Sequence, residues 1–241
     1  MQPPLSDTVL PVDAFEQQRV TELRAAQLKA EQLFLEIEKR GLIRPGISES
    51  RLNADIYDLA KEMHEITTYW HKRIVRAGTN TLAPYDENPP DLMICEDDIL
   101  FLDLGPVFED WEADFGRTFV LGSDPRKLKL RDDVCTAFAE GKRYFHENPG
   151  ITASQFFAYV VSLAHEFGWE FGGRIAGHLI GHFPHEKIAD DKVSLYVHPD
   201  SHLPMRSVNE KGQKRHWILE IHFVDRERQF GGFFEELLTV N

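Results

Sequence analysis

The sequence predicts a single α+β domain, and three observations carry this prediction. Two segments with apolar residues at helical spacing lead the chain, and a mixture of strand-like and helix-like segments follows them. No change in composition marks a domain boundary, and no internal repeat is visible. We therefore expect residues 1–12 to form an N-terminal extension and residues 13–241 to form one domain.

The two leading segments predict helices. In the first, Asp13 followed by Glu16 is typical of a capped helix start, and Gly41 is typical of a helix end. Its apolar face is formed by Val20, Leu23, Ala30, Phe34 and Ile37. In the second, either Ser48 or Ser50 can cap the first turn. Its apolar face is formed by Leu52, Ile56, Leu59 and Met63.

The rest of the chain mixes strands and helices. Strand-like composition occurs at residues 73–76, 99–106, 114–121, 216–224 and 233–240. Helical patterns cover residues 124–147 and a segment that begins at Thr152 or Ser154 and ends at Phe167. Between the last helix and the last strands, repeated glycines at 172, 173, 177 and 181 argue against a continuous helix.

The composition is acidic. Forty acidic residues against 27 basic residues give a formal charge of −13, which disfavours nucleic acid and anionic membranes as partners. The two cysteines, Cys95 and Cys135, fit buried thiols in a reducing compartment. No secretory signal is visible, and the longest nearly apolar run, residues 156–164, is too short to span a bilayer. These features predict a cytoplasmic enzyme or binding protein.

The most informative segment contains two aspartates on neighbouring predicted strands. A hairpin centred between Phe108 and Glu109 would put Asp103 directly opposite Asp114, with Cβ atoms about 4.5–5.5 Å apart. Two carboxylates this close, among Leu, Phe and Val residues, repel each other and resist desolvation. A divalent cation would remove both penalties, so the pair predicts a metal site. The alternative is a purely structural role, in which Asp114 lies at a loop edge and pairs with Arg117.

Three histidines lie within eight residues of the glycine-rich loop. His178 and His182 are four residues apart, as in a helical zinc pair, but Gly177, Gly181 and a following proline argue against a helix. His185 completes the group. A loop of this kind is a surface feature about as often as a site of chemistry.

Two glutamates lie inside predicted apolar strands near the end of the chain. Glu220 interrupts the segment 217–223, and Glu235 interrupts the segment 233–240. Exposed positions on edge strands would explain either residue alone. A buried carboxylate without a partner is costly, however, and these segments contain few basic residues.

Taken in order, these motifs resemble those of the methionine aminopeptidase/prolidase superfamily, the creatinase-like M24 metallopeptidases, in their single-domain form. The resemblance extends from about Ala14 to Val240 and rests on the aspartate pair, the Gly-His loop at 177–186, and the strands of Glu220 and Glu235. Each motif is weak alone, and the ordered set is specific. It implies the pita-bread fold, an α+β architecture in which helices cover a curved mixed antiparallel sheet, with residues 13–241 as the catalytic domain.

The resemblance also implies two divalent metal ions and the residues that bind them. Asp103 would chelate one ion, Asp114 and Glu235 would bridge both, and His178 and Glu220 would bind the second ion. Such an oxygen-rich ligand set suits manganese, cobalt, iron or zinc.

Further roles follow from the same resemblance. A hydroxide held between the cations would attack a scissile amide, Glu220 would shuttle its proton, and His185 would stabilise the oxyanion. Arg117 would orient the bridging Asp114. The family's substrate-facing histidine is replaced by Tyr85, which could still bind substrate through its hydroxyl. Either His71 or His182 could take the place of that histidine, and we assign His182 to substrate binding together with Tyr85.

The resulting functional hypothesis is an aminopeptidase or an Xaa-Pro-type dipeptidase. Two alternatives stay open: a creatinase-like hydrolase of a small non-peptide C–N bond, and a binding protein that has lost catalysis. The expected partner is a peptide or small amide, with no nucleic acid and no membrane, and a homodimer is compatible with this interpretation.

Overall fold

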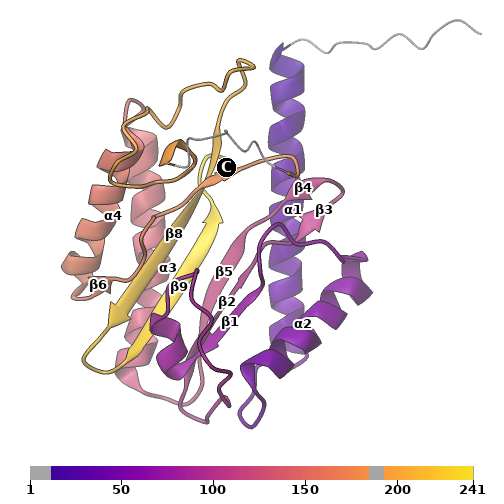
Figure 1. Cartoon of the computed structure of the whole chain (residues 1–241), viewed down its shortest axis with the longest axis vertical. Helices are drawn as coiled ribbons and strands as arrows, with labels where there is room; N and C mark the ends of the chain where they lie inside the picture. The colour runs from indigo at the N-terminus through magenta and orange to yellow at the C-terminus, as the bar shows by residue number, and fades with distance from the viewer. Residues whose placement is uncertain (1–11, 185–192, 241) are drawn as a thin grey trace, which may run out of the picture.

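The computed structural model describes residues 12–184 and 193–240. Within these ranges an antiparallel sheet is flanked by helices (Figure 1). The α+β architecture that the sequence predicts, with helices covering an antiparallel sheet, is confirmed. None of the helices in the described ranges is both long enough and apolar enough to cross a membrane.

The helices lie where the apolar patterns predict them: α1 (Val12–Lys39), α2 (Glu49–His64), α3 (Pro125–Glu147) and α4 (Ala153–Phe167). Ser48 caps α2 by accepting a hydrogen bond from the Arg51 backbone N–H, and Thr152 caps α4 in a capping box with Gln155. The predicted cap of the first helix is wrong. The backbone is already helical at Val12, so Asp13 lies inside α1.

Within the described part of the chain, seven strands form the main sheet, and they pair in the order β1-β2-β5-β9-β8-β6, with β7 added to β8. Every recorded pairing is antiparallel. The strands are β1 (Ile74–Ala77), β2 (Ile99–Leu104), β5 (Phe115–Val120), β6 (Glu170–Phe171), β7 (Leu179–Ile180), β8 (His216–Asp225) and β9 (Phe230–Leu237). A separate short hairpin pairs β3 (Val107–Phe108) with β4 (Trp111–Glu112), and two 3₁₀ helices, η1 (Gly78–Leu82) and η2 (Val193–Leu195), complete the elements.

The helices pack on one face of the sheet, in two groups. Leu100, Leu102 and Leu104 of β2 join the core that contains α1 and α2. Leu219 and Ile221 of β8 join a second core with α3 and α4 (Figure 1). Because side chains alternate between the two faces of a strand, the residues between these apolar positions point to the opposite face. That opposite face carries the carboxylates.

The two halves of the sheet meet at β5 and β9. Their recorded register contains one pair, Gly116 with Glu235. Nearby, the Thr118 hydroxyl donates a 2.8 Å hydrogen bond to the Phe233 carbonyl and lies 2.6 Å from the Phe233 backbone N–H, which donates to it. A side chain therefore supplies part of the pairing at this junction.

The predicted register of the acidic hairpin is wrong by two residues. Asp103 pairs with Gly116, because the turn is centred between Glu109 and Asp110. Both turn residues have positive φ angles, 50° and 72°, as a two-residue type I′ hairpin turn requires. Sequence alone does not suggest this turn, because Gly and Asn are its usual residues. A shift of two residues preserves the predicted face of each side chain.

Two smaller expectations are also wrong. The last strand, β9, begins at Phe230 and includes Gly231 and Gly232, which were predicted to precede it. These glycines allow close packing, since a Cβ at Gly232 would lie 2.0 Å from the Leu130 side chain. Cys95 and Cys135 are free, as predicted, but both are exposed rather than buried.

Candidate metal centre

A single row of paired residues crosses the sheet at the candidate site. Ile74 pairs with Asp103, Asp103 with Gly116, Gly116 with Glu235, and Glu235 with Glu220. Directly paired residues on neighbouring strands point to the same face, with Cβ atoms about 4.5–5.5 Å apart. The register of four strands therefore gathers three carboxylates from distant parts of the chain on the face opposite the helices.

The glycine in this row leaves space between two of the acids. A Cβ at Gly116 would lie 2.6 Å from the Phe233 ring and 3.1 Å from the Glu235 Cβ. Both distances are shorter than ordinary contacts, so any side chain at this position would push against its neighbours. We conclude that Gly116 keeps the face open between Asp103 and Glu235.

His178 approaches the row from the glycine-rich loop. Its Nε2 lies 2.9 Å from Asp114 Oδ2, 3.5 Å from Glu235 Oε1 and 3.7 Å from Glu220 Oε1. Gly177, with φ of 136°, brings the loop against β8, and a Cβ there would lie 2.1 Å from the Ile218 carbonyl oxygen. The structure thus brings all five residues predicted as ligands to one place: Asp103, Asp114, His178, Glu220 and Glu235.

Burial disfavours ionisation of three of these carboxylates. It raises the pKa of Asp103 to about 7 and that of Glu220 to about 8, and it also raises the pKa of Glu235, with repulsion from Asp114 and Asp103 adding to the effect. For Asp114 the opposite holds. Burial would raise its pKa, but the neighbouring histidines His71 and His178 hold it well below its usual range.

This chemistry fits a divalent cation site. Asp103 Oδ1 is buried and has no hydrogen-bond partner among the described residues, so no hydrogen bond offsets the cost of burying it. Asp114, His178 and Glu235 offer ligand atoms that all lie within 4.8 Å of one another. Four carboxylates and an imidazole form a largely oxygen-donor set, which suits manganese, cobalt, iron or zinc.

A second histidine, His71, also lies in the site. Its Nε2 is 3.2 Å from Asp114 Oδ1 and 3.5 Å from Asp103 Oδ1. Burial alone would lower the pKa of His71, but the charges of Asp114 and Asp103 raise it to about 9. Of the two histidines that the sequence offered as substitutes for the missing family residue, His71 is the one against the carboxylates. No sequence pattern around it marks this position.

The residues predicted to bind substrate lie farther from the carboxylates than His71 does. The side chain of Tyr85 is exposed, and its ring centroid lies 5.9 Å from that of His71. His182 is exposed and packs on Trp111, with ring centroids 5.4 Å apart, in a cavity of about 570 Å³ that Ile180 and His216 also line. Within the described ranges His182 makes no hydrogen bond, ion pair or ring contact with the five residues predicted as ligands. Its substrate role stays a prediction, and His185 lies outside the described residues.

Arg117 does not take the orienting position expected for it. Its guanidinium lies between the rings of Phe115 and Phe234, 3.8 Å from each centroid, and donates a 3.0 Å hydrogen bond to the Glu235 carbonyl and another to the Glu236 carboxylate. No recorded contact links it to Asp114 within the described ranges. Arg117 therefore supports the strand that carries Glu235.

Comparisons with known proteins confirm the predicted pita-bread fold and identify a family. Residues 21–213 match the model of metallopeptidase family M24. The fold matches a dipeptidase from Pyrococcus horikoshii OT3 with a TM-score of 0.73 at 24% identity, over 92% of this chain and 57% of that one. It matches a recombinant prolidase from Thermococcus sibiricus with a TM-score of 0.76 at 18% identity, over 98% and 66% of the two chains.

A shorter enzyme is also similar. Methionine aminopeptidase from Rickettsia prowazekii matches with a TM-score of 0.69 at 16% identity, over 93% of this chain and 94% of that one. The chain thus spans less than two thirds of the dipeptidase and the prolidase, but nearly the full length of the methionine aminopeptidase. No curated protein sequence gives a match.

Proposed function

The chain belongs to metallopeptidase family M24, and from that premise we propose that it is a metal-dependent exopeptidase. It would remove an N-terminal residue from a peptide or split an Xaa-Pro-type dipeptide. The observation that carries the proposal is the convergence of Asp103, Glu235 and Glu220, from one row of the sheet, with Asp114 and His178. A catalytic domain over residues 13–241 is part of this proposal.

The five residues would hold two divalent ions. Asp103, Asp114 and Glu235 would serve the first ion, and His178, Glu220, Asp114 and Glu235 the second. When bound, such ions supply Lewis-acid polarisation of a carbonyl group and make bound water more acidic. Manganese, cobalt, iron and zinc all suit the donors.

The protein's own residues would then handle binding and protons. The Glu220 side chain is 16% exposed, at the open face of the site. Glu220 would take up and return the proton of the attacking water, as the family resemblance implies. The Tyr85 hydroxyl would donate a hydrogen bond to the substrate, and His185 would stabilise the oxyanion, as the family resemblance implies.

The test combines metal content with hydrolysis of a peptide panel that includes Xaa-Pro dipeptides and Met-initiated peptides. We expect about two divalent ions per chain at saturation. Glu220→Ala should lose turnover, by about 10²- to 10⁴-fold or more, because it removes the proton-transfer group. His165→Ala changes an exposed histidine on α4 and is the matched control. A metal-free protein that stays inactive with added Mn²⁺ or Co²⁺ would refute the proposal.

A further inference from the structure

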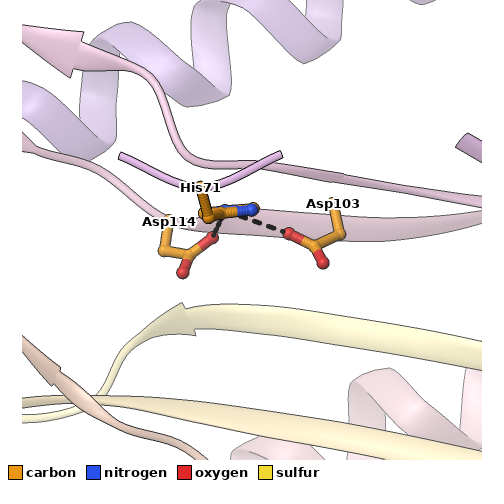
Figure 2. A group of neighbouring side chains, drawn as sticks. All are labelled: His71, Asp103 and Asp114. Atoms are coloured by element: carbon orange, nitrogen blue, oxygen red, sulfur yellow. Dashed lines mark hydrogen bonds and ion pairs between the residues drawn. The ribbon is translucent and has the colours of Figure 1, made fainter. Parts of the chain in front are cut away.

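We infer that His71 is an additional metal ligand, whose Nε2 binds the same cation as Asp103 and Asp114. The inference rests on the proposed metal-dependent function and adds a donor that the family motifs do not supply. Figure 2 shows the His71 side chain between the two carboxylates. The donor atoms of His71, Asp103 and Asp114 all lie within 4.8 Å of one another, so one ion can contact all three after small adjustments.

The unsatisfied oxygen of Asp103 points to a missing ligand. Asp103 is 8% exposed, and its Oδ1 has no hydrogen-bond partner among the described residues. The nearest recorded polar atom is His71 Nε2, at 3.5 Å, which is too long for a hydrogen bond. A cation bound by Asp103, His71 and Asp114 would give Asp103 Oδ1 the partner that it lacks.

The orientation of the His71 ring matches that of a ligand. Its Nδ1 donates a 2.7 Å hydrogen bond to the Lys72 carbonyl, which leaves Nε2 toward the carboxylates. His178 repeats this arrangement, with Nδ1 donating to the Leu179 carbonyl at 2.8 Å and Nε2 facing Asp114. A bond from the second ring nitrogen to a backbone carbonyl is the usual way in which proteins orient a metal-binding histidine.

The segment that carries His71 is held in place by several backbone contacts. The Trp70 N–H donates to the Gly105 carbonyl at 2.9 Å, the Trp70 indole donates to the Ala113 carbonyl at 3.1 Å, and the Val107 N–H donates to the Thr68 carbonyl at 3.1 Å. Gly105 creates the space for the imidazole, since a Cβ there would lie 2.1 Å from the His71 ring. The His71 side chain is 6% exposed, so it is a built part of the site.

The same contacts would also arise if His71 were a protonated imidazolium paired with the two aspartates. That state and the metal-bound state compete, because a cation replaces the Nε2 proton. In the metal-bound state Nε2 carries the cation, and in the protonated state it carries a proton. The response of Nε2 to added metal therefore distinguishes the two states.

Isothermal titration with Mn²⁺ and Zn²⁺ would compare the wild type with His71→Ala, His71→Gln, His178→Ala and the His165→Ala control. We expect two ions in the wild type and in the control. His71→Ala should bind one of the two ions about 10- to 100-fold more weakly, at least as much as the loss of a ligand-supporting group. His71→Gln serves the same purpose if the alanine variant does not fold.

A ¹⁵N-histidine NMR titration of the wild type with Zn²⁺ gives a readout that does not depend on activity. The Nε2 resonance of His71, assigned with the variants, should shift on metal binding together with that of His178. A wild type that binds two ions while the His71 resonance and the affinity of the His71 variants stay unchanged would overturn this inference alone. A wild type that binds no ion would overturn the proposed function as well.

Discussion

The two sides of Asp114 are built by different means. On one side, His178, Glu220 and Glu235 occupy or contact the central strands β8 and β9, and pairing between strands sets the carboxylate positions. On the other side, Asp103 is a strand residue, but its partner His71 comes from a loop before β1. Asp114 joins the sides, with Oδ2 facing His178 and Oδ1 facing His71.

The difference shows which kinds of site residue a sequence reveals. A carboxylate inside an apolar strand stands out, because burial of an unpaired charge is costly. A loop histidine does not stand out, because its position depends on what it rests against. For His71 that support is Gly105, a residue distant in sequence whose missing side chain makes the space.

The largest effect should come from Asp114→Asn, which changes both sides at once. The amide keeps the shape but removes the negative charge shared by His71 and His178. We expect the loss of both ions, with an affinity decrease larger than the about 10- to 100-fold typical of groups that only support a ligand. Metal analysis after dialysis would measure it. An Asp114→Asn variant that retains two ions would show that the sides do not depend on a shared carboxylate.

A smaller and one-sided effect should come from Gly105→Ala. The added methyl group would collide with the His71 and Trp70 side chains, so it should displace His71 and leave the His178 side in place. We expect a loss of about 1–3 kcal/mol in the free energy of unfolding, as for other overpacked sites, and weaker binding of one ion. Thermal unfolding and metal titration would measure the two effects.

Gly150→Ala is the matched control for this variant, because nothing lies within 4 Å of a Cβ at that position. Its free energy of unfolding should stay within about 0.5 kcal/mol of the wild type. Equal metal affinity in Gly105→Ala and Gly150→Ala would contradict the view that Gly105 positions His71.

The smallest effect should come from Tyr85→Phe. Tyr85 is exposed and lies beside His71, so its hydroxyl can contact substrate without contacting metal. Loss of one hydrogen bond of about 0.5–1.5 kcal/mol would raise KM by roughly tenfold or less, with metal affinity unchanged. Steady-state kinetics on the best peptide of the panel would measure this. A decrease in metal content would instead place Tyr85 among the groups that support the ions.

Most of the fold was predictable because its elements carry regular apolar patterns. The caps at Ser48 and Thr152 were also visible in the sequence. The register of the acidic hairpin was not predictable, because Glu109 and Asp110 adopt positive φ angles that their residue types do not indicate. The start of β9 was also predicted wrongly. Gly231 and Gly232 look like turn residues in the sequence, but in the structure they lie inside the strand and allow close packing.

The candidate site shows the same division. The five residues predicted as ligands from the order of the motifs lie together in the structure, and their role as ligands stays a prediction. The orienting role of Arg117 was wrong, because sequence proximity to Asp114 does not show that the guanidinium lies between Phe115 and Phe234. The choice between His71 and His182 depended on tertiary contacts, which no local pattern contains.

The junction between β5 and β9 gives the site a mechanical consequence. The two helix-backed halves of the sheet meet there through Gly116, Glu235 and the Thr118 hydroxyl, with little regular backbone pairing. Asp103 lies on one half and Glu235 on the other, so an ion held by both groups would connect the two halves across this junction. A ligand that binds only the folded state stabilises that state. Removal of the metal should therefore destabilise the contact between the two halves of the sheet as well as abolish hydrolysis.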